Sequence, residues 1–133
     1  MATIFTQIIN GDIPGRIVWS DDQVAAFLTI APLTAGHTLV VPRDEVDDWT
    51  QLPASLAAHL MTVSHRIGAA IKQAYSSPRV GLVIAGFEVP HAHVHVFPAW
   101  EMADFDFARV DSNVPAERLD EDQKRILAAL DRD

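Results

Sequence analysis

The sequence predicts an α+β fold in which an antiparallel sheet packs against one long helix. Three observations predict it: short apolar runs bounded by turn residues, one long central stretch with helical spacing of its apolar residues, and the order helix, strands, helix, strands. The chain has 133 residues, enough for one domain with a hydrophobic core and too few for two. We therefore expect a single domain over residues 1–133.

A short helix, a β-hairpin and a third strand are expected in the first part of the chain. Apolar residues at 4, 5, 8 and 9 have helical spacing, and an Asn-Gly-Asp turn signal at 10–12 ends this segment. The hairpin strands are residues 16–19 and 24–28, which four turn-forming residues join. Strand 37–41 follows and ends at a proline.

The centre of the chain predicts the long helix. Its apolar residues recur at spacings of three and four and form one stripe: Leu56, Leu60, Val63, Ile67 and Ile71. Pro53 stands near the beginning, where a missing N–H costs nothing, and a Ser-Ser-Pro sequence closes the helix.

Two more strands and a short helix complete the prediction. Residues 80–85 form an apolar run typical of a buried strand, and residues 91–97 form the fifth strand after a bend. The C-terminal tail, residues 99–133, contains a sequence at 120–123 that resembles a capping box, so a short final helix is expected there.

Charge and composition exclude several classes of partner. Ten Lys and Arg against 18 Asp and Glu give a formal charge of −8, which argues against nucleic acid as the main partner. No apolar run reaches the length of a membrane span, and the chain start does not resemble a secretory signal. The absence of cysteine excludes disulfides, thiolate catalysis and thiolate zinc sites. We expect a cytoplasmic protein with no membrane partner.

Histidine alternates with apolar residues in segment 91–97. On a strand the period is two, so the rings of His91, His93 and His95 would share one face. One alternative is three unrelated surface histidines, although a polar face normally carries Thr, Lys, Glu or Ser. Another is a metal site, but the outer rings would lie about 13 Å apart at roughly 3.3 Å per residue, against zinc–nitrogen bonds of about 2 Å. A metal would need ligands from elsewhere in the chain.

Attack on phosphorus by imidazole uses all three histidines. A neutral imidazole is a good nucleophile near neutral pH and needs no strong base. Rings on either side of it can donate hydrogen bonds to phosphoryl oxygens, where charge develops in the transition state. We therefore expect a reaction that needs no cofactor and no metal of the protein, with which a magnesium ion carried by the substrate is compatible.

Four blocks of residues 4–98 resemble the histidine-triad (HIT) family, and most closely its branch of histidine triad nucleotide-binding proteins. The blocks are residues 4–14, the Asp-Asp pair at 21–22, residues 36–42, and the three histidines. The resemblance implies a HIT-like fold with a meandering antiparallel five-stranded sheet, usually in a homodimer. It also implies hydrolysis or transfer of a nucleoside monophosphate through a covalent nucleotidyl–imidazole intermediate.

The resemblance also implies roles for individual residues. His93 matches the nucleophile, His95 a phosphate-binding partner, and His91 the position that supports the nucleophile. His37 matches an upstream histidine that borders the site. Six residues match those that enclose the purine base, although each taken alone indicates core: Ile4, Phe5, Ile8, Ile13, Phe27 and Ile30. Backbone N–H groups near the bend would hold phosphoryl oxygens, at Phe87, Glu88 and Val89 among others.

Three departures concern a metal. The family often has a Cys-x-x-Cys pair and a further histidine that bind a structural zinc together with the first triad histidine. Those places hold Thr3, Thr6 and Glu45 in this chain, so we expect the zinc to be absent.

Two departures concern the substrate. Thr29 replaces the ribose-binding aspartate of many members, and one hydroxyl accepts fewer hydrogen bonds than a carboxylate. Phe87 replaces a glutamine whose amide could donate to the substrate phosphate. We expect the Phe87 ring to pack beside the bend at Gly86 and the enzyme to be slow.

The function expected from the sequence is hydrolysis or transfer on nucleoside phosphoramidates or (di)nucleoside polyphosphates. His93 would attack the α-phosphorus, and water would then release nucleoside monophosphate. The alternative is a nucleotide-binding regulatory protein with vestigial catalysis, which Thr29 and Phe87 keep open. A turnover assay separates the two, because a vestigial protein binds nucleotide without forming an adduct.

Overall fold

A computed structural model describes residues 2–131 and contains a five-stranded sheet with helices around it. The sheet and helix bounds are as follows: α1 (Ile4–Ile9), β1 (Ile17–Ser20), β2 (Val24–Leu28), β3 (Thr38–Pro42), α2 (Ala54–Tyr75), β4 (Arg79–Val83), β5 (Val94–Ala99) and α3 (Ala116–Asp131). Three short 3₁₀ helices are Trp49–Gln51, Met102–Phe105 and Phe107–Arg109. No helix among residues 2–131 is long and apolar enough to cross a bilayer.

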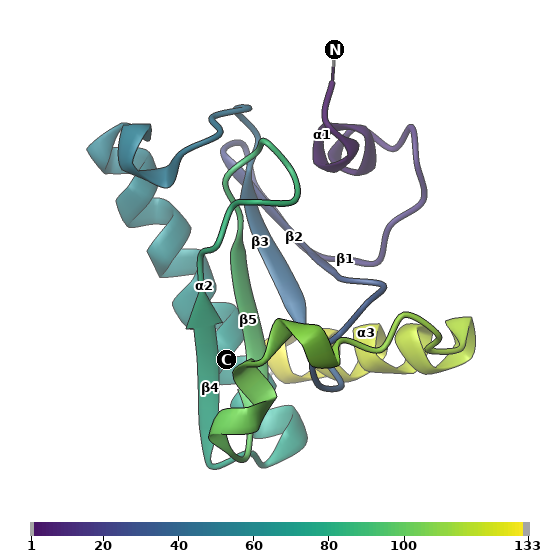
Figure 1. Ribbon diagram of the computed structural model, residues 1–133. Helices are drawn as coiled ribbons and strands as arrows, with labels where there is room; N and C mark the ends of the chain where they lie inside the picture. The colour runs from purple at the N-terminus through teal and green to yellow at the C-terminus, as the bar shows by residue number, and fades with distance from the viewer. Residues whose placement is uncertain (1, 132–133) are drawn as a thin grey trace.

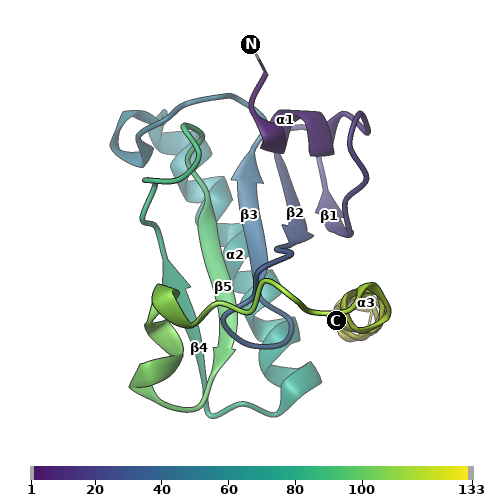
Figure 2. The same ribbon diagram turned by 45° about the vertical axis from the view of Figure 1, so that its right-hand side comes forward.

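The sheet is antiparallel throughout, with the strand order β1-β2-β3-β5-β4. The first three strands form a meander. Helix α2 then carries the chain to the edge strand β4, and β5 returns between β4 and β3 (Figures 1 and 2). The fold is therefore the predicted α+β class with five antiparallel strands, and the crossover through α2 makes β5 an interior strand.

Helix α2 covers one face of the sheet and forms the main core there. The predicted apolar stripe of α2 is buried and packs with side chains from β2, β3 and β5: Leu56, Leu60, Val63, Ile67, Ile71, Val24, Ala26, Val40, Val94 and Val96. Helix α3 adds Ile126 to the same cluster. Full burial of one large aliphatic side chain stabilises the fold by about 1.5–3 kcal/mol, so this layer holds β5 in place.

The other face of the sheet carries a smaller cluster beneath α1. Its buried members are Phe5, Phe27, Leu39 and Val41. Strands β2 and β3 are buried on both faces, so successive side chains go to opposite clusters. Figure 2 shows α1 near the end of β3. This arrangement brings the start of the chain close to the residues that precede β5.

Two predicted boundaries near the chain's last elements are wrong. The strand predicted at 91–97 begins at Val94 and continues through Pro98 to Ala99. Proline is tolerated there because β3 pairs with β5 only as far as Val96, so no N–H is needed on that side. Helix α3 begins at Ala116, where the Pro115 carbonyl accepts two backbone N–H groups, so the capping-box-like residues 120–123 lie inside the helix.

Candidate active site

His93 lies at the end of the loop that leads into β5, and its ring is nearly buried, with 3 % exposed. The His93 Nδ1–H donates to the carbonyl oxygen of His91 at 2.8 Å. A carbonyl can only accept, so Nδ1 carries the hydrogen and Nε2 keeps its lone pair. Burial lowers the pKa of His93, which favours the neutral ring. His93 is thus in the tautomer and charge state of a nucleophile.

His37 and His95 form a second ordered pair. The backbone N–H of Leu33 donates to His37 Nδ1 at 2.9 Å, so the hydrogen of a neutral His37 ring is on Nε2. That nitrogen lies 3.0 Å from His95 Nδ1 and donates to it. The hydrogen of His95 is consequently on Nε2. Burial, and then the neighbouring imidazoles, lower the pKa of His37 to about 3 and that of His95 to about 4.

A cavity of about 190 Å³ lies beside these rings. It is lined by Ala85, Gly86, Phe87, Glu88, His93, His95 and Phe107. The ring centroids of His93 and His95 are 4.9 Å apart, with one edge toward the other's face. A phosphoryl group in this cavity would meet a nucleophilic nitrogen and an N–H donor at once.

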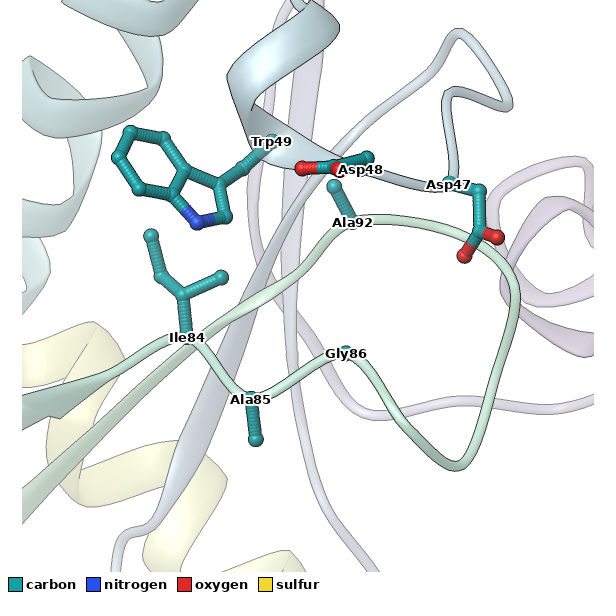
Figure 3. A pocket seen from close by; sticks show the side chains of 7 residues that line it. All are labelled: Asp47, Asp48, Trp49, Ile84, Ala85, Gly86 and Ala92. Carbon is teal, nitrogen blue, oxygen red and sulfur yellow. The ribbon is translucent and has the colours of Figure 1, made fainter.

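The loop that lines this cavity contains Gly86, which has a φ of +78°. L side chains rarely adopt this conformation, so glycine permits the bend before the histidines. The same loop borders a second hollow of about 230 Å³, lined by Asp47, Asp48, Trp49, Ile84, Ala85, Gly86 and Ala92. In Figure 3 the Trp49 indole lies beside Ile84, and Asp47 lies across the hollow. None of the six histidines lines it.

His91 does not line the cavity beside His93 and His95, which corrects the expectation that three rings share one face. The ring is fully buried, and its Nε2 donates to the Pro42 carbonyl at 2.7 Å. Its Nδ1 lies 2.7 Å from the Thr3 hydroxyl. The alternation of a strand starts only at Val94, so it cannot place His91 beside His93 and His95.

The residues expected at the purine base divide into a buried and an exposed group. Phe5 and Phe27 are buried with ring centroids 5.6 Å apart, and Phe5 is 4.9 Å from the His93 ring. Ile4 and Ile30 are 49 % and 72 % exposed. The other two, Ile8 and Ile13, are half-buried, and so are Thr29, expected at the ribose, and Val89, expected at the phosphate. The Thr29 hydroxyl accepts from the Ala31 N–H at 3.1 Å. None of these residues lines the cavity that contains the histidines.

Two aromatic residues differ from expectation. Phe87 is 96 % exposed, so the expected packing of its ring beside the bend is wrong. The residue lies in the loop between β4 and β5, where side chains commonly face solvent. Phe107 lines the cavity, and its ring centroid is 4.8 Å from that of His95. No pattern in the sequence linked Phe107 to the histidines.

Thr3, Thr6 and Glu45, which replace the family's zinc ligands, lie close together near His91. Thr6 donates its hydroxyl hydrogen to Glu45 at 2.6 Å, and Thr3 contacts His91. Zinc is bound by cysteine, histidine and carboxylate side chains, and hydroxyls are not among its usual protein ligands. Among residues 2–131, no three His, Asp or Glu side chains form a group able to hold a metal ion. The residues at this position do not fit the family's zinc.

Beside the antiparallel sheet, a buried imidazole whose Nε2 keeps its lone pair thus lies next to a second imidazole, and both line one cavity. The family model of the HIT domain matches residues 10–102. The chain therefore belongs to the HIT family, which includes nucleotide hydrolases.

Known relatives are similar over most of the chain. An uncharacterized HIT-like protein of Borreliella burgdorferi is 36 % identical over 89 % of this chain and 91 % of its own. The bifunctional bis(5'-adenosyl)-triphosphatase/adenylylsulfatase FHIT of Arabidopsis thaliana is 29 % identical over 90 % of this chain and 67 % of its own. The crystal structure of a zinc-bound histidine triad family protein from Mycobacterium smegmatis superimposes with a TM-score of 0.83 and 28 % identity, covering 99 % of this chain and 95 % of that one.

Proposed function

We propose that the protein is a nucleotidyl hydrolase or transferase that cleaves purine nucleoside phosphoramidates or (di)nucleoside polyphosphates through a covalent adduct on His93. The observation that carries the proposal is the 2.8 Å hydrogen bond from His93 Nδ1 to the His91 carbonyl. It leaves the Nε2 lone pair of a cavity-lining ring available for attack. Membership of a family with nucleotide-hydrolysing relatives supports the choice of substrate.

In the first step, Nε2 of His93 attacks the α-phosphorus and a P–Nε2 bond forms. The bond from phosphorus to the leaving amine or phosphate breaks, and its electron pair leaves with that group, which takes a proton from solvent. The His95 Nε2–H donates to a phosphoryl oxygen, where negative charge increases in the transition state. The adduct ring is positively charged, and the His91 carbonyl stabilises that charge through Nδ1–H.

In the second step, water attacks the same phosphorus and releases nucleoside monophosphate. The electron pair of the P–N bond returns to Nε2, and the water's proton passes to solvent, so His93 regains its neutral tautomer. The base and ribose would lie on the side of His93 where Phe5 contacts its ring, with the Thr29 hydroxyl toward the sugar. No step needs a metal or cofactor of the protein.

The rival proposal is a nucleotide-binding regulatory protein with vestigial catalysis. It is supported by Phe87, whose exposed ring supplies no donor to a phosphate, and by the single hydroxyl of Thr29. The two proposals differ in whether an adduct forms. A regulatory protein would bind adenosine monophosphate without a burst of product.

The test uses His93→Gly and adenosine 5'-phosphoramidate. Turnover should fall by about four orders of magnitude or more when the nucleophile is removed, while adenosine monophosphate still binds. Mass spectrometry of acid-quenched wild type should find a nucleotidyl adduct on His93. Turnover by His93→Gly near the parent rate, or a wild type that binds nucleotide without an adduct, would contradict the proposal.

A homodimer is part of this proposal. Trp49, Met61 and Leu82 are half-exposed around an apolar groove of about 170 Å³ between α2 and the edge strand β4. An edge strand beside exposed apolar side chains is a common site for pairing with a second copy. Sedimentation should show a wild-type dimer that Met61→Glu dissociates. Leu127→Glu on α3 is the matched control and should leave the dimer intact.

A further inference from the structure

A cluster of hydrogen bonds joins the start of α1 to His91, two residues before the proposed nucleophile. His91 Nε2 lies 2.7 Å from the Pro42 carbonyl oxygen, which can only accept a hydrogen bond. In a neutral ring the other nitrogen then accepts, so the Thr3 hydroxyl donates to His91 Nδ1 across 2.7 Å. The ring is thereby fixed at both nitrogens, between α1 and β3.

Thr3 is itself held in one orientation. Its backbone N–H donates to Glu45 Oε1 at 2.7 Å, and the Thr6 hydroxyl donates to the same oxygen at 2.6 Å. These two hydrogen bonds, that of the Thr6 hydroxyl first, lower the pKa of Glu45, so the acceptor is a carboxylate at neutral pH. The Thr3 oxygen also caps α1 by accepting the Thr6 N–H. The Thr3 hydroxyl oxygen also lies 3.4 Å from that of Thr6, but His91 Nδ1 is much closer at 2.7 Å, so the hydroxyl hydrogen of Thr3 is directed to His91.

The backbone of His91 completes the connection to His93. Its N–H donates to the Val89 carbonyl at 2.7 Å, and the next residue, Ala92, donates its N–H to Val46 at 2.8 Å. Its own carbonyl accepts the His93 Nδ1–H. A rotation or tilt of residue 91 would therefore move the acceptor that fixes the tautomer of His93.

We propose that Thr3 is a positioning residue for His93, acting through a metal-free hydrogen-bonded cluster of Thr3, Thr6, Glu45 and His91. The proposal rests on the proposed function of His93 as nucleophile. Side chains that fit no zinc site hold His91 by hydrogen bonds instead. Around metal sites, outer groups that orient a ligand affect activity by about 10- to 100-fold, and we expect the same scale for a group that orients an imidazole nucleophile.

A purely structural role for Thr3 makes a different prediction. A helix cap that only stabilises α1 would lower the melting temperature when removed, with no change in the ring tautomers of the folded protein. A positioning residue changes the state of the His93 ring in protein that remains folded. The tautomers of His91 and His93 therefore distinguish the two roles.

The experiment compares Thr3→Val, Thr3→Ser and Thr62→Val by two measurements. Nitrogen-15 NMR of histidine-labelled protein reports which ring nitrogen carries hydrogen, and turnover of adenosine 5'-phosphoramidate gives kcat and KM. Thr3→Val should mix the tautomers of His91 and His93 and lower kcat by about 10- to 100-fold with little change in KM. Thr3→Ser should restore both. Thr62 donates to a carbonyl of its own helix, so Thr62→Val should match wild type.

Unchanged tautomers with parental kcat in Thr3→Val would overturn the proposal, and so would a kcat loss that Thr3→Ser fails to restore. If Thr3→Val does not fold, Glu45→Ala removes the anchor of Thr3 from the surface, and the same shift in tautomers is expected. A wild type that turns over no nucleotide would refute the proposed function alone. The NMR measurement would still decide whether Thr3 orders His93.

Discussion

Nε2 of His37 and Nδ1 of His95 lie 3.0 Å apart and share one hydrogen, which belongs to His37. The backbone N–H of Leu33 occupies the other nitrogen of His37 and fixes this assignment. A proton added to His95 would place two hydrogens between the same two nitrogens. The pair therefore keeps His95 neutral, with its remaining N–H free to donate to a substrate.

Turnover should persist to lower pH than the ordinary pKa of histidine would allow. Burial lowers the pKa of His93, and burial and then the His93 ring lower that of His95 to about 4, so both rings stay neutral to lower pH than a free histidine does. The measurement is kcat/KM against pH, with the chemical stability of the substrate checked in buffer alone. A midpoint of activity at or above pH 6.5 would show that the rings are more hydrated than described.

Stability should fall as the pH drops from 6.5 toward 4. The unfolded chain binds protons at histidines with a pKa near 6.5, whereas folded His37 and His95 take them up only at about 3 and 4. The unfolded state thus binds more protons in this window, and lower pH favours it. Chemical denaturation at pH 7, 6 and 5 measures the slope. His37→Asn removes one of the two groups and should flatten it; an unchanged slope would contradict the assignment.

Phe87→Gln should raise the catalytic rate without a cost in stability. An amide at this position can donate to a phosphoryl oxygen, and one such donor is worth about 3 kcal/mol, roughly a hundredfold in rate, at most. The ring is 96 % exposed, so its loss should change the free energy of unfolding by less than about 0.5 kcal/mol. Met102→Gln, at another exposed apolar residue outside the cavity, is the matched control. No gain in kcat on any substrate would show that the missing amide does not limit the enzyme.

Glu88 should make the cavity select against anionic leaving groups. Its carboxylate lines the cavity with His93, and no Lys or Arg is among the lining residues. The Glu88 carboxylate would repel a negatively charged polyphosphate leaving group, and no lining cation would offset that repulsion. An amine leaving group would not be repelled. One charge pair at 4 Å is worth about 1 kcal/mol in water. Glu88→Gln should therefore raise kcat/KM for diadenosine polyphosphate about fivefold relative to adenosine phosphoramidate.

The control for Glu88→Gln is Asp47→Asn, which removes the same charge on the far side of the loop. Asp47 lines the second hollow and none of the histidine cavity (Figure 3). In Asp47→Asn, the ratio of kcat/KM for diadenosine polyphosphate to kcat/KM for adenosine phosphoramidate should equal that of wild type. If this ratio changes equally in Glu88→Gln and Asp47→Asn, the cause is a general effect of net charge. The prediction that Glu88 selects against anionic leaving groups would then be wrong.

The spacing of apolar residues was sufficient to predict the main helix and the sheet, because burial of one face requires that spacing. The stripe from Leu56 to Ile71 is buried as its spacing indicates, since a helix on a sheet must bury one face. The same reasoning failed at His91, where the alternation of residues continues three positions beyond the strand. Hydrogen bonds, rather than side-chain period, determine where that ring lies.

Contacts between distant residues could not be predicted from the sequence alone. Thr3 and His91 are 88 positions apart, and neither threonine nor histidine marks its partner. The exposure of Phe87 and the contact of Phe107 with His95 depend on the paths of a loop and of the tail. The resemblance to the HIT family indicated His93 as the proposed nucleophile, but the tautomers followed only from the geometry of the hydrogen bonds.

Installing metal ligands should test whether Thr3, Thr6 and Glu45 lie close to His91 and to one another. The triple variant Thr3→Cys, Thr6→Cys and Glu45→His would supply two thiolates and one imidazole, with His91 Nδ1 as the fourth donor. Thr3 Oγ1 is already 2.7 Å from that nitrogen, and Thr6 Oγ1 is 2.6 Å from Glu45. Two thiolates and two imidazoles are a common tetrahedral set for zinc, with zinc–sulfur bonds of about 2.3 Å.

The triple variant should retain one zinc ion per chain after dialysis. Its melting temperature should fall when a chelator removes the zinc, because metal binding is then linked to folding. The variant with Thr3→Ser, Thr6→Ser and Glu45→Gln is the matched control; it alters the same positions without adding a ligand and should bind none. Elemental analysis and thermal melts with and without chelator make the measurement. A folded triple variant without zinc would mean that α1 does not approach His91 closely, and the positioning role of Thr3 would lose its geometric basis as well.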